Sequence, residues 1–151
     1  MTGPTLGQTQ TSHANVVLAV NLAPADRLAL SALCRRKQWG IRLAGRLMQA
    51  ARKAAAADVR VVICGHELPD GIWKELFERV RDFAHAPRFI VVSQTADERL
   101  WAEVLNLGAH DVLAAPFDAE ELCRVMSYAM PEPAWKGRVY RAAIQSNGGF
   151  Q

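Results

Sequence analysis

Short apolar runs and longer mixed segments alternate along the chain. The apolar runs are continuous rather than interrupted at every second residue, which predicts strands covered on both faces, as in a parallel sheet. We expect five such strands, over residues 16–20, 41–44, 59–64, 89–92 and 112–114.

The mixed segments repeat apolar residues at helical spacing. In the first of them, Leu28, Leu30, Leu33 and Cys34 form an apolar stripe behind Pro24, and proline suits the first turn of a helix. The predicted helices run from Pro24 to a break at Gly40, over 45–57, 71–84 and 97–107, and from a cap at Asp118 to Met130.

Strands and helices therefore alternate five times, which predicts an α/β fold. We expect a doubly wound five-stranded parallel sheet of flavodoxin-like type, with helices on both faces and right-handed connections. The site of such a sheet lies beyond the carboxyl ends of the strands, near the reversal in strand order. The 151 residues fit one domain over 16–130, with a flexible N-terminal segment over 1–15 and a tail over 131–151.

Composition narrows the cellular setting. Cys34, Cys64 and Cys123 are far apart in apolar segments, which predicts buried thiols in a reduced compartment rather than disulfides or metal ligands. The first residues form no signal peptide pattern, and no apolar run approaches the roughly 20 residues that cross a bilayer. We therefore expect a cytoplasmic protein without a membrane partner.

Positive charge is concentrated in the first third of the chain, although the net charge is only +3. The residues are Arg35, Arg36, Lys37, Arg42, Arg46, Arg52 and Lys53. Such a cluster is either a surface for nucleic acid or an acidic protein, or simply solvated helix faces. No aromatic residues for base stacking interleave with these charges, so we do not expect nucleic acid as a partner.

Several motifs punctuate the predicted elements in a characteristic order. Pro24 and Arg27 follow the first strand, and Leu68-Pro69-Asp70-Gly71 follows the third. Gly108-Ala109 precedes the last strand, and Pro116-Phe117 follows it. Over about residues 16–130, this order and spacing resemble the receiver domains of response regulators in two-component phosphorelay signalling, the CheY-like family.

The resemblance assigns chemistry to positions at the strand ends. The phosphate-accepting aspartate of the family lies six residues before Gly71, and that residue here is Gly65. The acidic positions that help to hold Mg²⁺ are Asn21 and Leu22, and the position of the phosphate-binding lysine is Ala115. The hydroxyl position keeps Ser93, and the aromatic switch position is Val112.

These substitutions predict a degenerate receiver, a pseudo-receiver that lacks the phosphoacceptor. Mg²⁺ needs oxygen ligands and phosphoryl transfer needs positioned charge, and neither is supplied at these positions. We therefore expect no catalytic residue, no metal and no cofactor, and no enzyme activity. Nearby, Glu67 and Asp70 are either a relocated metal or phosphate site or a solvated turn, and His66 is either catalytic or a surface group; we favour the second interpretation of each.

The expected function is protein binding that does not depend on phosphorylation, by a stand-alone protein of bacterial-type signalling. The partner would be a kinase, a regulator, an effector or a second copy. In the family, the helix before the last strand, that strand and the last helix form the output and dimer face. Here the face would comprise Trp101, Leu105, Leu122, Val125 and Tyr128. Two alternatives remain: a phosphorelay through an unorthodox residue, or a small-molecule-binding flavodoxin-like domain.

Overall fold

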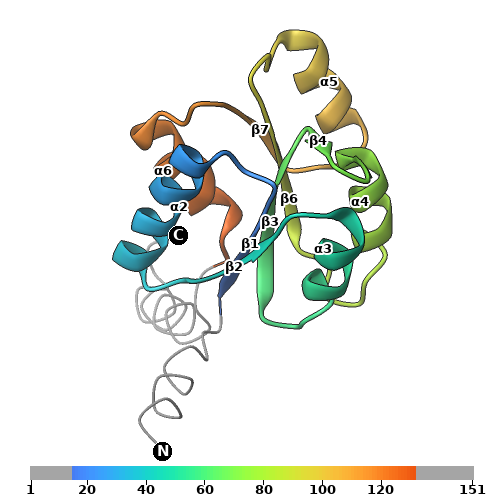
Figure 1. Cartoon of the computed structure of the whole chain (residues 1–151), viewed down its shortest axis with the longest axis horizontal. Coiled ribbons are helices and arrows are strands. Elements are labelled where there is room, and N and C mark those ends of the chain that lie inside the picture. The colour runs from blue at the N-terminus through green and yellow to red at the C-terminus, as the bar shows by residue number, and fades with distance from the viewer. Residues whose placement is uncertain (1–14, 132–151) are drawn as a thin grey trace, which may run out of the picture.

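A five-stranded parallel sheet forms the middle layer of the molecule, with the strand order β2-β1-β3-β6-β7 (Figure 1). The structure is a computed structural model and describes residues 15–131. The strands of this sheet are β1 (Val16–Val20), β2 (Gly40–Ala44), β3 (Val59–Gly65), β6 (Arg88–Ser93) and β7 (Asp111–Ala114). Every neighbouring pair is parallel, which confirms the predicted fold class.

Helices cover both faces of the sheet (Figure 1). On one face lie α2 (Pro24–Lys37) and α6 (Ala119–Ala129), and on the other lie α3 (Leu47–Ala54), α4 (Trp73–Val80) and α5 (Glu98–Asn106). The buried side chains accordingly form two apolar clusters, one on each face of the sheet. This division explains the continuous apolar strands, because successive residues of β1 enter opposite clusters and all are buried.

The aromatic part of the core lies under α4. Trp73 is 1% exposed, and its ring centroid lies 6.2 Å from that of Phe77 and 6.3 Å from that of Phe89. Phe77 and Phe89 meet edge to face at 5.3 Å. This cluster joins α4 to β6 and fixes the helix against the sheet.

One part of the structure differs from the prediction: a small hairpin lies between β3 and α4. It consists of β4 (Glu67–Leu68) and β5 (Gly71–Ile72), which are antiparallel. The helix predicted from residue 71 therefore begins at Trp73, where the Ile72 amide donates to the Glu75 carboxylate over 3.0 Å. The sequence pattern placed the start of this helix too early, because the apolar Ile72 fits the helical spacing although it belongs to β5.

The prediction was wrong for Leu28, which is 71% exposed on α2 and lies outside its buried stripe. Otherwise the remaining elements differ from the prediction only at their ends. The first helix stops at Lys37, α3 is shorter than the predicted 45–57, and α4 ends at Val80 rather than at residue 84. The predicted N-terminal segment and tail lie outside the described residues except for Asn15 and Pro131. None of the helices within residues 15–131 is long and apolar enough to cross a membrane.

Candidate functional site at the carboxyl ends of the strands

The strand order reverses between β1 and β3, since the chain passes from β1 to β2 on one side and then to β3 on the other. A hollow of about 490 Å³ lies at the carboxyl ends of these strands. Its lining includes the predicted positions Asn21, Leu22, Gly65, Ser93 and Ala115, together with Asp26, His66 and Glu67. The structure thus brings together every predicted site position except Val112, which lies on β7 among the lining of a different hollow.

Backbone atoms pack closely around Gly65, which lies at the end of β3. A Cβ atom at this position would lie 2.9 Å from the carbonyl oxygen of Asn21, 3.6 Å from that of Glu67 and 3.7 Å from that of Val20. Carbon and oxygen atoms in ordinary contact are farther apart than the first of these distances. Any side chain at residue 65 therefore requires the loop after β1 to move.

Asn21 fixes this loop. Its backbone φ is +52°, in the left-handed region that asparagine tolerates better than most residues. Its side-chain amide donates to the Glu67 carbonyl oxygen over 2.9 Å, and its backbone N–H donates to the carbonyl oxygen of Ala44 over 2.9 Å. Asn21 thus joins the loop after β1 to both β2 and the β4 hairpin, across Gly65.

Leu22 and Ser93 are turned inward. Leu22 is 8% exposed and packs with the apolar cluster under α2 and α6, so it offers no ligand atom. Ser93 is equally buried, and its hydroxyl accepts a hydrogen bond from the Thr95 amide over 3.1 Å. The hydroxyl also lies 3.3 Å from the Thr95 hydroxyl. The retained hydroxyl therefore takes part in the turn that follows β6.

Asp26 is a site residue that the sequence analysis missed. It lies in the first turn of α2, is 4% exposed, and its carboxylate accepts a hydrogen bond from the Phe117 amide over 2.8 Å. This bond joins α2 to the loop between β7 and α6, which contains the cis peptide bond Ala115–Pro116. The one sequence signal was an acidic residue in the first turn of a helix, which usually indicates a favourable interaction with the helix dipole.

The charges of the hollow do not suit a phosphoryl group or Mg²⁺. Among the described residues 15–131, Asp26 and Glu67 are the two that place carboxylates in its lining, and no lysine or arginine lines it. Within residues 15–131, no three His, Cys, Asp or Glu side chains are grouped as a metal site would require. Since Mg²⁺ prefers several oxygen ligands and a phosphoryl group prefers positive charge, the residues present do not fit either of them.

Asp70 acts on a neighbouring helix rather than on the hollow. Its carboxylate accepts a hydrogen bond from the Leu47 amide over 2.7 Å and so caps the start of α3. Hydrogen bonds from the backbone at Leu47 and Met48 hold the pKa of Asp70 below its ordinary value. His66 donates its backbone amide to the Val92 carbonyl oxygen over 2.8 Å. The 66–71 loop is therefore a hydrogen-bonded connection between β3, β6 and α3.

The predicted interaction face is partly exposed and partly buried. Trp101 is 51% exposed and Tyr128 is 73% exposed, whereas Leu105 is half-buried. The prediction was wrong for Leu122 and Val125, which are 2% and 1% exposed in the apolar cluster under α6. They lie about one helical turn apart on the side of α6 that faces the sheet, and this side packs into the core. Val112 is also buried, at 6% exposed.

The three cysteines are free thiols, as predicted, but the predicted burial was wrong for Cys123. Cys34 and Cys64 are buried, whereas Cys123 is partly exposed. Burial raises the pKa of Cys34 to about 11 and raises the pKa of Cys64 further. Both buried thiols therefore stay protonated at neutral pH and behave as apolar core groups.

Comparison with protein families identifies the family of this chain. The model of the response regulator receiver domain matches residues 17–127 of the chain. The chain belongs to the response regulator receiver domain family. No curated protein sequence matches it. Receiver domains of this family are components of two-component signalling.

Three solved structures illustrate the likeness. The signal receiver domain of an HD domain-containing protein from Pseudomonas fluorescens Pf-5 is 23% identical, with a TM-score of 0.66 over 76% of this chain and 93% of that chain. CheY4 of Vibrio cholerae is 21% identical, with a TM-score of 0.67 over 76% and 98%. A chain of the CheX-CheY-BeF₃-Mg²⁺ complex from Borrelia burgdorferi is 18% identical, with a TM-score of 0.66 over 74% and 86%. At these identities the likeness concerns the fold.

Proposed function

We propose that this receiver domain acts in two-component-type signalling by binding proteins, without accepting a phosphoryl group. One observation carries the proposal: the position of the phosphoacceptor is Gly65, where the Asn21 carbonyl oxygen would lie 2.9 Å from any Cβ atom. The nucleophile is thus absent, and even the first side-chain carbon at this position would lie too close to the backbone.

The surroundings of Gly65 support the same proposal. Asn21 and Leu22 provide no carboxylate, Ala115 provides no ammonium group, and the Ser93 hydroxyl is engaged by Thr95. Phosphoryl transfer depends mainly on positioned charge, and each of these positions lacks it. We propose, in addition, that the domain has no catalytic activity of its own.

A solved complex of a similar chain supports protein binding. The CheY chain of the Borrelia burgdorferi complex was crystallised with a second protein, CheX. In this chain, the exposed aromatic residues Trp101 and Tyr128 lie on α5 and α6. Aromatic residues are enriched at the centres of protein interfaces, so we place the partner on this α5–β7–α6 face.

Treatment with a small phosphodonor, followed by intact-mass and peptide mass spectrometry, tests the proposal. We expect no added phosphoryl group on the wild-type chain in the presence of Mg²⁺. Gly65→Asp should also remain unmodified, because Asn21 and Leu22 still provide no carboxylate and Ala115 still provides no ammonium group. A stoichiometric phosphoryl group on the wild-type chain would refute the proposal, and its position would identify an unorthodox acceptor residue.

A further inference from the structure

The two edges of the sheet carry opposite charges. The strand β2 forms one edge, and α2 and α3 lie beside it in the sequence. Residues 35–53 contain no Asp or Glu, but they contain seven basic residues. We call these seven residues the basic edge: Arg35, Arg36, Lys37, Arg42, Arg46, Arg52 and Lys53.

Most of the basic edge is open to solvent. Arg42 is paired with Asp58 at 2.8 Å, and Lys53 donates to the Leu43 carbonyl oxygen over 2.6 Å. The side chains of the other five are exposed: Arg35, Arg36, Lys37, Arg46 and Arg52. The positive charge of this edge is therefore accessible to another molecule.

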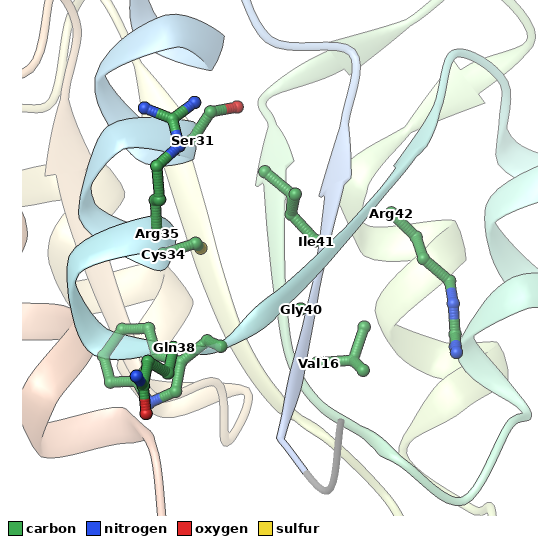
Figure 2. Close-up of a pocket in the computed structure, with 9 residues that line it drawn as sticks. Val16, Ser31, Cys34, Arg35, Gln38, Gly40, Ile41 and Arg42 are labelled. Carbon is green, nitrogen blue, oxygen red and sulfur yellow. The ribbon is translucent and has the colours of Figure 1, made fainter. Parts of the chain in front are cut away.

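A cleft of about 820 Å³ gives the basic edge apolar surface as well as charge. It lies between α2 and β2, with Ser31, Cys34 and Arg35 on the helix and Ile41 on the strand (Figure 2). Figure 2 shows the Arg42 side chain directed away from α2, in keeping with its pairing to Asp58. Leu43 and Met48, each 46% exposed, add further apolar surface to this edge.

The opposite edge of the sheet is acidic. It is formed by β7, with α5 and α6 beside it in the sequence. Residues 97–124 contain seven acidic residues and two arginines, Arg99 and Arg124. We call the seven acidic residues the acidic edge: Asp97, Glu98, Glu103, Asp111, Asp118, Glu120 and Glu121. Lys74 neutralises Glu103 and Arg124 lies 3.8 Å from Glu121, so the larger part of this negative charge remains.

A hollow of about 380 Å³ lies within the acidic edge beside Trp101. Among the described residues, its lining includes four acidic residues, Asp97, Glu98, Asp111 and Glu121, against one basic residue, Arg124. The carboxylates of Asp97 and Asp111 each also accept a backbone hydrogen bond, from Leu100 and Val112. A guanidinium group pairs with carboxylates and stacks on indole rings, whereas a further carboxylate would be repelled. The hollow is therefore suited to an arginine side chain from another molecule.

Charge also decides between two ways in which copies of the chain can meet. A twofold pairing of two acidic edges would bring seven acidic residues against seven, which like-charge repulsion opposes. The basic edge, in contrast, presents exposed arginines and apolar Leu43 and Met48 to an acidic surface that contains Trp101. Both halves of a complementary contact are therefore present on the same chain, at opposite ends of the sheet.

We propose that a second copy of the chain docks head to tail, with the basic edge of one copy against the acidic edge of the next and an arginine in the hollow beside Trp101. Such a contact is heterologous and leaves one edge of each kind free to continue the assembly. The inference rests on the proposed function in one respect, since it names the occupant of the α5–β7–α6 face. It does not depend on whether residue 65 can be phosphorylated. A phosphorylation assay can therefore refute the proposed function without refuting this contact, and an association assay can refute the contact without refuting the proposed function.

Sedimentation of the full chain in about 0.01 M and about 1 M salt tests the contact, because charges are screened beyond about 30 Å and about 3 Å respectively. We expect the average mass to rise with protein concentration in low salt and to return to that of the monomer in high salt. Wild-type chain that stays monomeric in low salt would overturn the proposal. A monomer that binds an arginine-rich peptide at Trp101 would do so too, and would assign the hollow to another protein.

Charge reversal identifies the two surfaces. The double variant Arg36→Glu with Arg52→Glu places negative charge within the basic edge, and Glu98→Lys with Glu121→Lys places positive charge within the acidic edge. We expect each variant alone to lose association by roughly tenfold or more. An equimolar mixture should form heterodimers, because the unmodified acidic edge of the first variant then meets the unmodified basic edge of the second.

The matched control is Glu78→Lys with Asp82→Lys, two exposed positions on α4 and just after it. It has the same charge change as the acidic-edge variant and should associate as wild type does. Association unchanged in either edge variant, or absent from the mixture of two folded variants, would refute the proposed contact.

Discussion

The carboxyl end of the sheet and the α5–β7–α6 face differ in how their side chains are used. At the carboxyl end, Asn21, Asp26 and Ser93 all form hydrogen bonds to other parts of the chain. On the α5–β7–α6 face, Trp101 and Tyr128 extend into solvent. The first region therefore holds the loops of the domain together, and the second remains open to a partner. This difference is in keeping with the proposed role of the domain in binding rather than in phosphoryl transfer.

The two tryptophans of α4 and α5 give the largest expected contrast. Trp73→Ala should reduce the free energy of unfolding by about 3–5 kcal/mol, because it empties the aromatic cluster with Phe77 and Phe89. Trp101→Ala should change it by no more than about 0.5 kcal/mol, since half of that side chain is exposed. Chemical denaturation of both variants measures the contrast. Similar losses for the two would show that Trp101 belongs to the core and not to an interaction face.

Gly65 and Gly45 test whether the strand end is closed. Gly65→Ala should destabilise the domain by about 1–3 kcal/mol, because the new Cβ atom meets the Asn21 carbonyl oxygen at 2.9 Å. A Cβ atom at Gly45 would meet no other atom within 4 Å, so Gly45→Ala should be neutral or stabilising by up to about 1 kcal/mol. Urea titrations of the two variants give the comparison. Equal stability of Gly65→Ala and wild type would mean that the site is open rather than closed.

Asp26 tests whether the strand end is held together by its polar groups. Asp26→Ala should destabilise the domain by about 1–3 kcal/mol, because the Phe117 amide loses its buried acceptor. Asp26→Asn should lose less, since the amide oxygen can still accept. Thermal and chemical unfolding of both variants, with the exposed Asp82→Ala as the control, measures the effect. A loss no greater for Asp26→Ala than for Asp82→Ala would show that this hydrogen bond does not stabilise the strand end.

The smallest expected effect is the pH dependence of the α3 cap. The pKa of Asp70 is lowered by backbone hydrogen bonds, so its ionised form stabilises the fold above the unfolded-state pKa of about 3.9. That contribution is lost as the pH falls through the lower folded-state pKa. We expect Asp70→Asn to be less stable than wild type at pH 7, with the difference shrinking at acid pH. A difference that does not depend on pH would show that charge plays no part in the cap.

Most of the fold could be predicted because continuous apolar strands and amphipathic helices have different periods. The β4–β5 hairpin could not, since two-residue strands have no periodicity to detect. The hydrogen bond from Phe117 to Asp26 and the capping of α3 by Asp70 could not be predicted either, because each joins residues far apart in the sequence. Leu122 and Val125 were predicted on the wrong side of α6, because an apolar residue on a helix can serve a core or an interface equally well. Only the packing of α6 on the sheet distinguishes the two.

An NMR titration of the ¹⁵N-labelled chain with Mg²⁺ and then beryllofluoride tests the central claim most directly. Beryllofluoride mimics a phosphoryl group on a carboxylate, and its binding requires an acceptor carboxylate and a bound cation. Gly65 has no carboxylate, and Asn21 and Leu22 provide no acidic ligands for the cation. We predict no saturable change in the amide signals of Asn21, Gly65 or Ser93 with either reagent. Saturable shifts at these three residues would show that the strand end still binds a metal and a phosphoryl mimic, and would contradict a receiver domain that works by binding alone.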